Sequence, residues 1–256
     1  INSGEYPYVN EKEKDFFFME RTDEQSIVAL ISELATTRLS AYYDGIDPIK
    51  DIQILTPVRK GTLGTASLNT ELQRMLNPPD VMKTEKKLGD RLFREGDKVM
   101  QTRNNYQIGW KKRRDFSEGQ GVFNGDIGYI HSIDNDAGQM TVIFDEDRFV
   151  SYEYGQLDEI ELAYAMTVHK SQGSEFPIVV MPVSWFPPML ATRNLLYTAV
   201  TRGKKVVILC GMQRRMEAMV DNNRIKLRFS GLKHRLRALI GRSIIGSNEE
   251  ALGNEI

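Results

Sequence analysis

The fold class follows from two apolar runs, Ile178-Val179-Val180-Met181 and Val206-Val207-Ile208-Leu209. Both runs are almost continuous in Val, Ile, Leu and Met, which is typical of strands buried on both faces of a parallel sheet. The residues from Arg193 to Arg202 between them predict a helix. The order strand, helix, strand therefore indicates an α/β fold with a parallel sheet.

The first 80 residues extend this pattern. The run Phe16-Phe17-Phe18 predicts a strand, and residues 52–57 predict a buried strand that stops at Pro57. Apolar residues at helical spacing, with Asp23 as the N-cap, predict a helix that ends near Tyr43. A second helix is predicted over residues 65–76. Helices on both faces of the sheet are therefore expected.

The segment from about Gly89 to Glu161 has a different pattern, with short alternating runs separated by turn dipeptides such as Asn124-Gly125. It predicts a small antiparallel sheet or barrel inserted into the α/β unit. The run VIFDED at 142–147 resembles the Asp-Glu motif that holds magnesium in ATPases. The alternation that continues after it, from Arg148, indicates a hairpin tip instead. The predicted organisation is 1–88, 89–161, 162–240 and a tail at 241–256, which is expected to be disordered.

The composition is that of an ordinary globular protein, with 256 residues, 41% hydrophobic and 27% charged. The single cysteine, Cys210, excludes disulfides and cysteine metal clusters, and no metal site is predicted. No run approaches the ~18 apolar residues of a membrane span. We therefore expect a cytoplasmic protein without a membrane partner.

The net charge of −1 conceals two blocks of opposite charge. Residues 202–242 contain twelve Lys and Arg against two acids, and they include predicted basic helices at 214–220 and 231–240. Residues 134–161 contain nine acids against one base. Separate blocks fit a protein with one face for a polyanion, although solvated helix faces explain the charge equally well.

The chain has no G-x-x-x-x-G-K-[ST] phosphate loop. Three other segments suggest chemistry. In the first, residues 55–61, the cations Arg59 and Lys60 follow the carboxyl end of a buried strand, where open α/β sheets bind their ligands. The second, residues 165–176, concentrates hydroxyls, an imidazole, a lysine, an amide and a carboxylate before a strand, a composition that suits phosphate contacts. The third ends at Arg202, an always-charged planar donor placed just before the strand at 206–209.

These segments closely resemble motifs IV, V and VI of superfamily 1 helicases. Five segments are similar in detail to the sequences of the RecD/TraA branch: LTPVRKGTLG (55–64), GDKVMQTRNNY (96–106), FNGDIG (123–128), TVHKSQGSEF (167–176) and NLLYTAVTRGK (194–204). The resemblance covers about residues 1–240. It implies the second RecA-like motor domain of a 5′-to-3′ DNA helicase, interrupted by an SH3-like barrel. The phosphate loop and the Asp-Glu motif are then expected upstream, in a first motor domain.

The resemblance also implies site residues. Arg202 matches the arginine finger on the γ-phosphate. Arg59 matches the motif IV arginine, and Lys60 is an alternative to it, so these three are the expected catalytic residues. The resemblance further implies nucleotide contacts for Gln172, Gly173 and Glu175, and DNA contacts for Thr167, His169, Thr56 and Asn69. Asn104 and Asn105 also match the sequences of this branch, but no role is expected for them.

The implied cofactors are ATP and magnesium, bound mainly by the upstream domain, so this chain alone is expected to be inactive. The implied partners are single-stranded DNA, a duplex junction, the upstream motor domain and subunits of a nuclease complex. Three alternatives stay open: a non-catalytic DNA-binding adaptor, the helicase part of a conjugative relaxase, and a nuclease. The run Lys111-Lys112-Arg113-Arg114 is predicted to be a flexible loop near the duplex junction.

Overall fold

The computed structural model describes residues 1–11, 14–224, 231, 235 and 236. The chain divides into two units, Ile1–Asn223 and Arg224–Ile256. The first unit contains all the elements discussed below. The predicted helix at 231–240, apart from the three residues named, and the predicted disordered tail at 241–256 lie outside the described residues.

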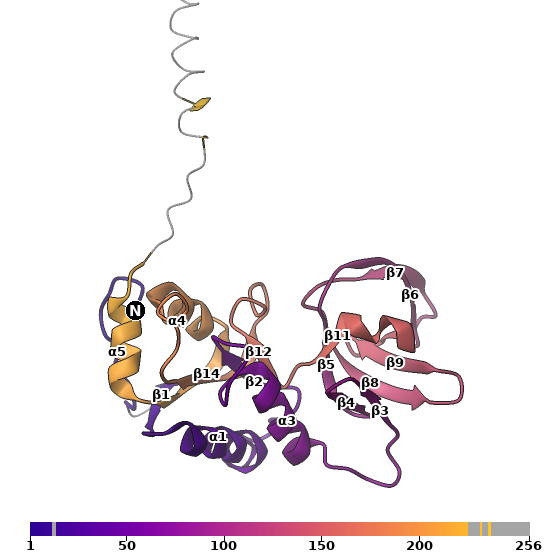
Figure 1. The fold of residues 1–256 in the computed structure, drawn as a ribbon, viewed down its shortest axis with the longest axis horizontal. Helices are drawn as coiled ribbons and strands as arrows, with labels where there is room; N and C mark the ends of the chain where they lie inside the picture. The colour runs from indigo at the N-terminus through magenta and orange to yellow at the C-terminus, as the bar shows by residue number, and fades with distance from the viewer. Residues whose placement is uncertain (12–13, 225–230, 232–234, 237–256) are drawn as a thin grey trace, which may run out of the picture. The chain divides into compact units, whose positions relative to one another are not determined.

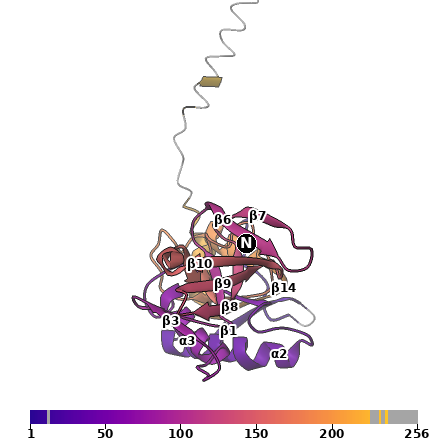
Figure 2. The ribbon, with the colours of Figure 1, turned by 90° about the vertical axis from the view of Figure 1, so that its right-hand side faces the viewer.

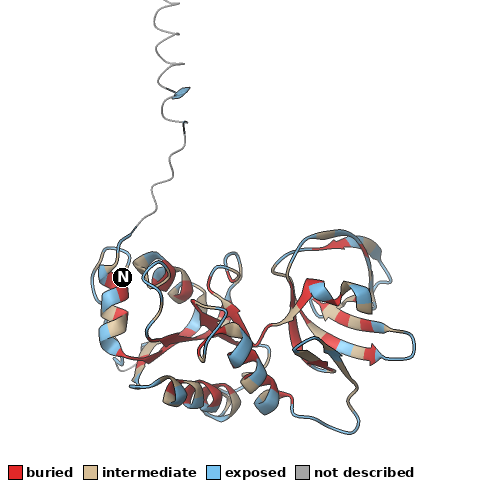
Figure 3. Ribbon diagram, viewed as in Figure 1, coloured by how far each residue is buried: buried red, intermediate tan, exposed pale blue. Residues whose placement is uncertain are grey.

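A parallel five-stranded sheet forms the centre of the α/β part, as predicted (Figure 1). Every neighbouring pair of strands in it is parallel. Most residues of these strands are buried, which explains their continuous hydrophobicity (Figure 3). In spatial order the strands are β1 (Phe16–Glu20), β14 (Gly203–Gly211), β13 (Phe176–Val183), β2 (Ile52–Thr56) and β12 (Ala165–Thr167).

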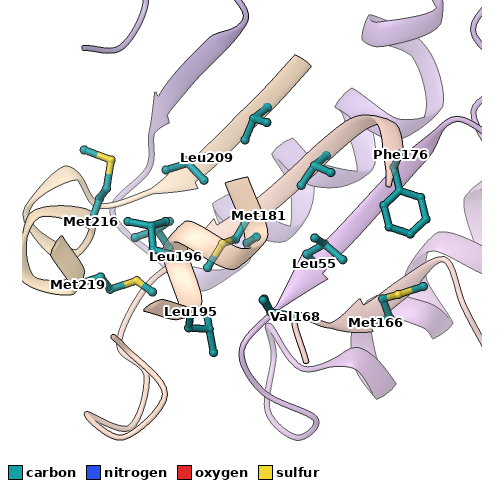
Figure 4. Packing of buried hydrophobic residues seen from close by; sticks show 14 of the residues in the cluster. Leu55, Met166, Val168, Phe176, Met181, Leu195, Leu196, Leu209, Met216 and Met219 are labelled. Carbon is teal, nitrogen blue, oxygen red and sulfur yellow. The ribbon is translucent and has the colours of Figure 1, made fainter. Parts of the chain in front are cut away.

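Helices cover both faces of this sheet (Figure 1). On one face, α1 (Glu24–Glu33) and α3 (Thr65–Leu76) pack on strand residues that include Ile178 and Val180. On the other, α4 (Arg193–Val200) and α5 (Gln213–Asp221) pack on residues that include Val179 and Met181. Alternate residues of β13 thus face opposite layers. Figure 4 shows the second layer, with Leu196 and Met216 close to Leu209.

The ends of the helices are close to those expected. The Asp23 side chain accepts a 2.8 Å hydrogen bond from the Ser26 amide, so Asp23 is the predicted N-cap of α1. The helical path continues through a π-helical turn (Leu34–Arg38) and α2 (Leu39–Tyr42). The prediction that the third helix reaches Arg202 is wrong by two residues, because α4 ends at Val200.

The middle of the chain forms antiparallel strands around a core of its own (Figure 2). A β3–β4 hairpin (Glu85–Leu88 and Arg91–Arg94) begins before residue 89, so the expected boundary falls inside it. A short 3-10 helix, η2 (Tyr154–Glu159), precedes the last strand. The seven-stranded sheet has the order β11 (Ile160–Leu162), β5 (Lys98–Gln101), β8 (Ile127–Asp134), β9 (Gln139–Phe144), β10 (Arg148–Glu153), β6 (Asn105–Lys112) and β7 (Glu118–Val122).

Two interpretations of this region are decided by strand pairing. Phe144 pairs with Arg148 across β9 and β10, so residues 145–147 are the predicted hairpin tip and the resemblance to a magnesium motif is accidental. The prediction of a flexible loop at 111–114 is wrong for its first half. Lys111 and Lys112 belong to β6 and pair with β10, and only Arg113 and Arg114 lie in the turn that follows.

A buried lysine lies where β5 meets the parallel sheet. Lys98 is 1% exposed, and its Nζ donates to the carbonyl oxygen of Ile52 at 3.4 Å. Burial lowers the pKa of Lys98 to about 7, against the opposing influence of Asp47 and Asp51. The lowered pKa means that folding removes a proton from this amine over part of the alkaline range.

This lysine predicts a pH-dependent stability. Between about pH 7 and the ordinary pKa of about 10.4, the unfolded state binds the Lys98 proton and the folded state does not, so the free energy of unfolding rises with pH. Lys98→Met should abolish this rise and stabilise the chain at pH 7 by about 1–3 kcal/mol. Urea unfolding at pH 7 and 9.5 measures both effects. The matched control is Lys87→Met on the exposed side of β3, and a pH slope that persists in Lys98→Met contradicts the explanation.

Candidate functional site

The predicted site residues divide between the two edges of the parallel sheet. Ile52 pairs with Ile178, so Phe176 is level with residue 50, six residues before Thr56 along the common strand direction. At roughly 3.3 Å per residue, this separation is about 20 Å. We call the edge where β2 and β12 end the carboxyl edge, and the edge where β13 and β14 begin the amino edge.

A cavity of about 770 Å³ opens at the carboxyl edge. The loops that follow β2 and β12 line it, and the two loops are held together because the Val168 amide donates to the Thr56 carbonyl oxygen at 3.1 Å. The loop after β13 contributes an aromatic wall, and Glu24 is an acidic residue in the lining. The cations and aromatic residues of this lining are Arg59, Lys60, His169, Lys170, Trp185 and Phe186.

The loop at 57–64 is held in a compact shape that exposes its two cations. The Thr56 hydroxyl donates to the Leu63 carbonyl oxygen at 2.6 Å. The carbonyl oxygens of Val58 and Arg59 accept the first amides of α3, from Thr65 and Ala66, so this helix N-terminus is already capped from within. Thr56 itself is fully buried. The prediction that its side chain contacts DNA is therefore wrong, and its role is to hold the loop.

Asn69 is likewise a structural residue. Its Nδ2 donates to the carbonyl oxygens of Ala165 at 2.9 Å and Leu162 at 3.0 Å, and its Oδ1 accepts the Ala165 amide at 2.8 Å. It is 8% exposed. The predicted DNA contact is wrong for this side chain, because its polar atoms are used in joining α3 to β12.

Thr167, His169 and Lys170 form the second part of the carboxyl edge. Thr167 ends β12 opposite Thr56, and its carbonyl oxygen accepts the Lys170 amide at 2.9 Å, which turns the chain. His169 is exposed. Burial lowers the pKa of Lys170, the negative charge of Glu161 opposes this shift, and the positive charge of Arg59 adds a smaller lowering. The cations of the two loops are thus close enough to influence each other.

Two asparagines of the antiparallel part support the same region. Asn104 Oδ1 accepts the Asn124 amide at 2.9 Å, and Asn124 Oδ1 in turn accepts from Lys170 Nζ at 3.4 Å. Asn105 Nδ2 donates to Glu159 at 3.0 Å. Both asparagines therefore have a structural role.

Arg202 lies at the amino edge, on the turn between α4 and β14. Its Nε donates to the Thr198 carbonyl oxygen at 3.1 Å, its Nη1 to the Ser174 carbonyl oxygen at 3.2 Å, and its Nη2 to the Thr201 hydroxyl at 3.1 Å. Three of the five guanidinium N–H groups are used in this way, which leaves two without a partner among the described residues. The side chain is therefore oriented in advance and still able to bind an anion.

The segment that carries the other predicted nucleotide contacts ends beside Arg202. The Phe176 amide donates to the Arg202 carbonyl oxygen at 2.8 Å, which holds the end of the segment 172–175 next to the arginine. Gly173 has φ +91°, a conformation that favours glycine, and Gln172 is exposed. Glu175 forms an exposed 3.2 Å ion pair with Lys204. The structure therefore places Glu175 beside Arg202, whereas the Gln172 amide donates to His169 near the start of the segment.

The three predicted catalytic residues do not lie at one edge. Arg59 and Lys60 follow β2 at the carboxyl edge, whereas Arg202 precedes β14 at the amino edge. The structure places them with Thr167 and His169. The signal was available in the sequence, because a residue after one parallel strand and a residue before another lie at opposite edges.

Three residues of the carboxyl edge were missed as site candidates: Lys170, Trp185 and Phe186. Lys170 lies inside the segment 165–176, but the resemblance implies no contact for it. Trp185 and Phe186 directly follow the buried strand β13, and the rule that drew attention to Arg59 applies to them equally.

Two kinds of feature are absent from the part of the chain that the structure describes. No group of three or more His, Cys, Asp or Glu side chains is arranged there to hold a metal ion. Within the same residues, no helix is both long enough and apolar enough to cross a membrane.

Two family models match this chain. Residues 68–144 match the SH3 domain of ATP-dependent RecD-like DNA helicases, which confirms the SH3-like part of the predicted fold. Residues 162–210 match the UvrD-like helicase C-terminal domain. The second match contains the segment 165–176 and Arg202, so residues of both edges fall within it.

Curated proteins with similar sequences include a DNA helicase and subunits of the RecBCD enzyme. The ATP-dependent RecD2 DNA helicase of Deinococcus radiodurans is 32% identical over 73% of this chain and 24% of that protein. The RecBCD enzyme subunit RecD of Mycolicibacterium smegmatis is 29% identical over 76% of this chain and 31% of its own length. The chain thus spans about a quarter to a third of these relatives. A Pif1 helicase from Bacteroides bound to ssDNA matches in structure with a TM-score of 0.45 and 17% identity, over 76% of this chain and 48% of that one.

Proposed function

We propose, from the premise that the chain belongs to the RecD-like family of superfamily 1 helicases, that it supplies the second motor half of an ATP-dependent DNA helicase. The observation that carries this proposal is the division of the sheet into two chemically different edges. The amino edge has an oriented arginine beside a turn of polar residues, and the carboxyl edge has a cavity with cations and aromatic residues. A motor that couples ATP to DNA needs both kinds of site.

The amino edge is proposed to face ATP. Arg202 would direct its two remaining N–H donors at the phosphate charge that develops during hydrolysis, which is the role of an arginine finger. Gln172, Gly173 and Glu175 would line the rest of this half of the nucleotide site. Because this sequence has no G-x-x-x-x-G-K-[ST] phosphate loop, this loop and the magnesium beside it are assigned to the other half of the motor.

The carboxyl edge is proposed to bind the backbone of single-stranded DNA. Thr167 supplies a hydroxyl and His169 an imidazole, and Arg59 and Lys60 are reassigned from the ATP phosphates to this backbone. Contacts of this kind are tolerant of base sequence, as movement along a strand requires. A 5′-to-3′ direction, and association with subunits of a nuclease complex, belong to the same proposal.

Residues 168–175 are proposed to transmit the cycle from one edge to the other. This segment follows Thr167 on the proposed DNA side and ends beside Arg202 on the proposed ATP side. Closing of the two motor halves around ATP would push on its second end and shift the first end along the DNA. The chain's own residues would thus bind and orient, while the other half supplies the metal and the phosphate loop.

The two edges predict separable defects. Arg59→Ala and Lys60→Ala should each weaken single-stranded DNA binding about 3- to 10-fold, and each should lower the slope of log K against log salt by about 0.7. The maximal ATP turnover at saturating DNA should stay within about twofold of the wild type. Fluorescence anisotropy with an oligo(dT) across a salt series, together with DNA-stimulated ATP hydrolysis of the full-length protein, measures both quantities.

The control for this experiment is Lys87→Ala, which removes an exposed lysine from the β3–β4 hairpin, outside the carboxyl-edge cavity. It should change neither measurement. If Arg59→Ala or Lys60→Ala instead lost turnover at saturating DNA with unchanged DNA affinity, these cations would act on ATP, and the assignment of the carboxyl edge to DNA would be wrong.

A further inference from the structure

Trp185 is exposed in an unusual place for a large aromatic residue. It lies two residues after the buried end of β13, is 66% exposed, and forms part of the wall of the carboxyl-edge cavity. Nothing about the fold requires an indole here, because the sheet ends at Val183 and the next helix begins at Arg193. A solvent-facing indole at a ligand edge requires another explanation.

The ring of Trp185 is held in position by Arg215. The guanidinium of Arg215, on α5, lies over it in a cation–π arrangement. Arg215 is brought there by the close approach of the ends of β13 and β14, where the Met212 amide donates to the Val183 carbonyl oxygen at 3.0 Å. A Cβ at Gly211 would lie 1.9 Å from the same oxygen, so this approach depends on glycine. The indole is therefore oriented before any ligand binds.

The loop that carries Trp185 is also fixed at its far side. Asn222 Nδ2 donates to the carbonyl oxygens of Pro188 at 2.9 Å and Ala191 at 2.7 Å. The Pro187 carbonyl oxygen accepts the Leu190 amide at 2.8 Å, which closes a turn within the loop. Little conformational entropy remains to be lost when a planar ligand stacks on the indole.

The surroundings of the ring favour one class of ligand. Arg59, Lys60, His169 and Lys170 line the same cavity, and Glu24 is the one acid in its lining. Cations that follow a backbone, combined with an exposed aromatic face, are the two features that single-stranded nucleic acid requires of a binding surface. An apolar protein segment would gain nothing from the four basic side chains.

We infer that Trp185, held by Arg215, is a platform on which a base of single-stranded DNA stacks while the neighbouring cations bind its backbone. This inference rests on the proposed function of the carboxyl edge and adds a base-directed contact to it. Trp185 is thus a binding residue that acts on the bases, in contrast to Arg59 and Lys60, which act on the phosphates.

The test separates bases from backbone in the full-length protein. Anisotropy titrations compare an oligo(dT) with an oligonucleotide of the same length made of abasic sites. Trp185→Ala should raise the Kd for oligo(dT) about 5- to 100-fold and change the Kd for the abasic strand less than about twofold. Trp185→Phe should keep most of the affinity for oligo(dT), and Arg215→Ala should lose part of it, again without loss on the abasic strand.

Lys60→Ala serves as the reference, because loss of a phosphate contact should weaken both strands equally. Equal losses of affinity for both strands in Trp185→Ala would show that the ring does not stack on a base. Unchanged affinity for both strands would show that the ring does not contact this DNA. Either result overturns the inference. Failure of the proposed function is distinguishable, since then Lys60→Ala would also bind both strands as tightly as the wild type.

Discussion

Arg202→Ala is expected to reduce DNA-stimulated ATP hydrolysis by about 10³- to 10⁵-fold and to leave the Kd for single-stranded DNA within about twofold. The magnitude is that of removing an arginine finger in GTPases. The separation of the two effects follows from the structure, because Arg202 lies about six strand residues from the level of Thr56 and the cations of the carboxyl edge. Steady-state turnover and anisotropy on the same full-length preparation measure both.

Two variants sharpen this experiment. Arg202→Lys keeps the charge but cannot donate to the Thr198 and Ser174 carbonyl oxygens and to a phosphate at once, so most of the loss should remain. Lys205→Ala removes an exposed cation three residues away and should be nearly neutral. Full turnover in Arg202→Ala would favour the non-catalytic adaptor. Parallel loss of turnover and DNA binding would indicate misfolding.

Asp97→Asn is expected to destabilise the chain by about 3 kcal/mol. The Asp97 carboxylate is fully buried and accepts hydrogen bonds from Asn77 at 2.7 Å, Tyr164 at 2.9 Å, Gln73 at 2.6 Å and the Arg94 amide at 2.7 Å. Burial raises the pKa of this carboxyl, and the four donors oppose the shift. An amide presents its own donor to two of these groups, which leaves buried donors unpaired.

The loss should appear as a lower urea midpoint with an unchanged slope. The matched control is Asp136→Asn, an exposed carboxylate in the β8–β9 turn, which should change stability by less than about 0.5 kcal/mol. Because Asp97 joins α3, β4 and Tyr164, its loss also tests whether the antiparallel part stabilises the helix on which β12 packs. A midpoint equal to that of the control would show that the four hydrogen bonds are replaceable.

Local patterns predicted the elements well. The helix over residues 65–76 and the buried strand predicted at 52–57 agree with the structure within about a residue. These elements are recognisable because burial imposes a period on each strand or helix separately. The strand residues at 111–112 are not recognisable from the sequence because both are lysines, and hydrophobic burial imposes no period on them.

Site residues were predicted less evenly, for a related reason. A motif shows which polar side chains occur together. It does not show which of them form hydrogen bonds within the folded protein. Thr56 and Asn69 have the chemistry of a nucleic-acid contact, but their polar atoms are bonded to Leu63, Leu162 and Ala165. Only the packed structure shows that no donor remains for a ligand.

The sequence by itself determined the α/β class, the antiparallel insertion and the resemblance to superfamily 1 helicases, because these depend on residue types at short spacing. The tertiary structure alone decided which predicted residues act together. Arg59 lies with Thr167 and His169 in the lining of one cavity, Arg202 donates to Ser174, and Trp185 meets Arg215 across two strand ends. The physical reason is that strand direction and register result from pairing between distant segments, which local periodicity does not encode.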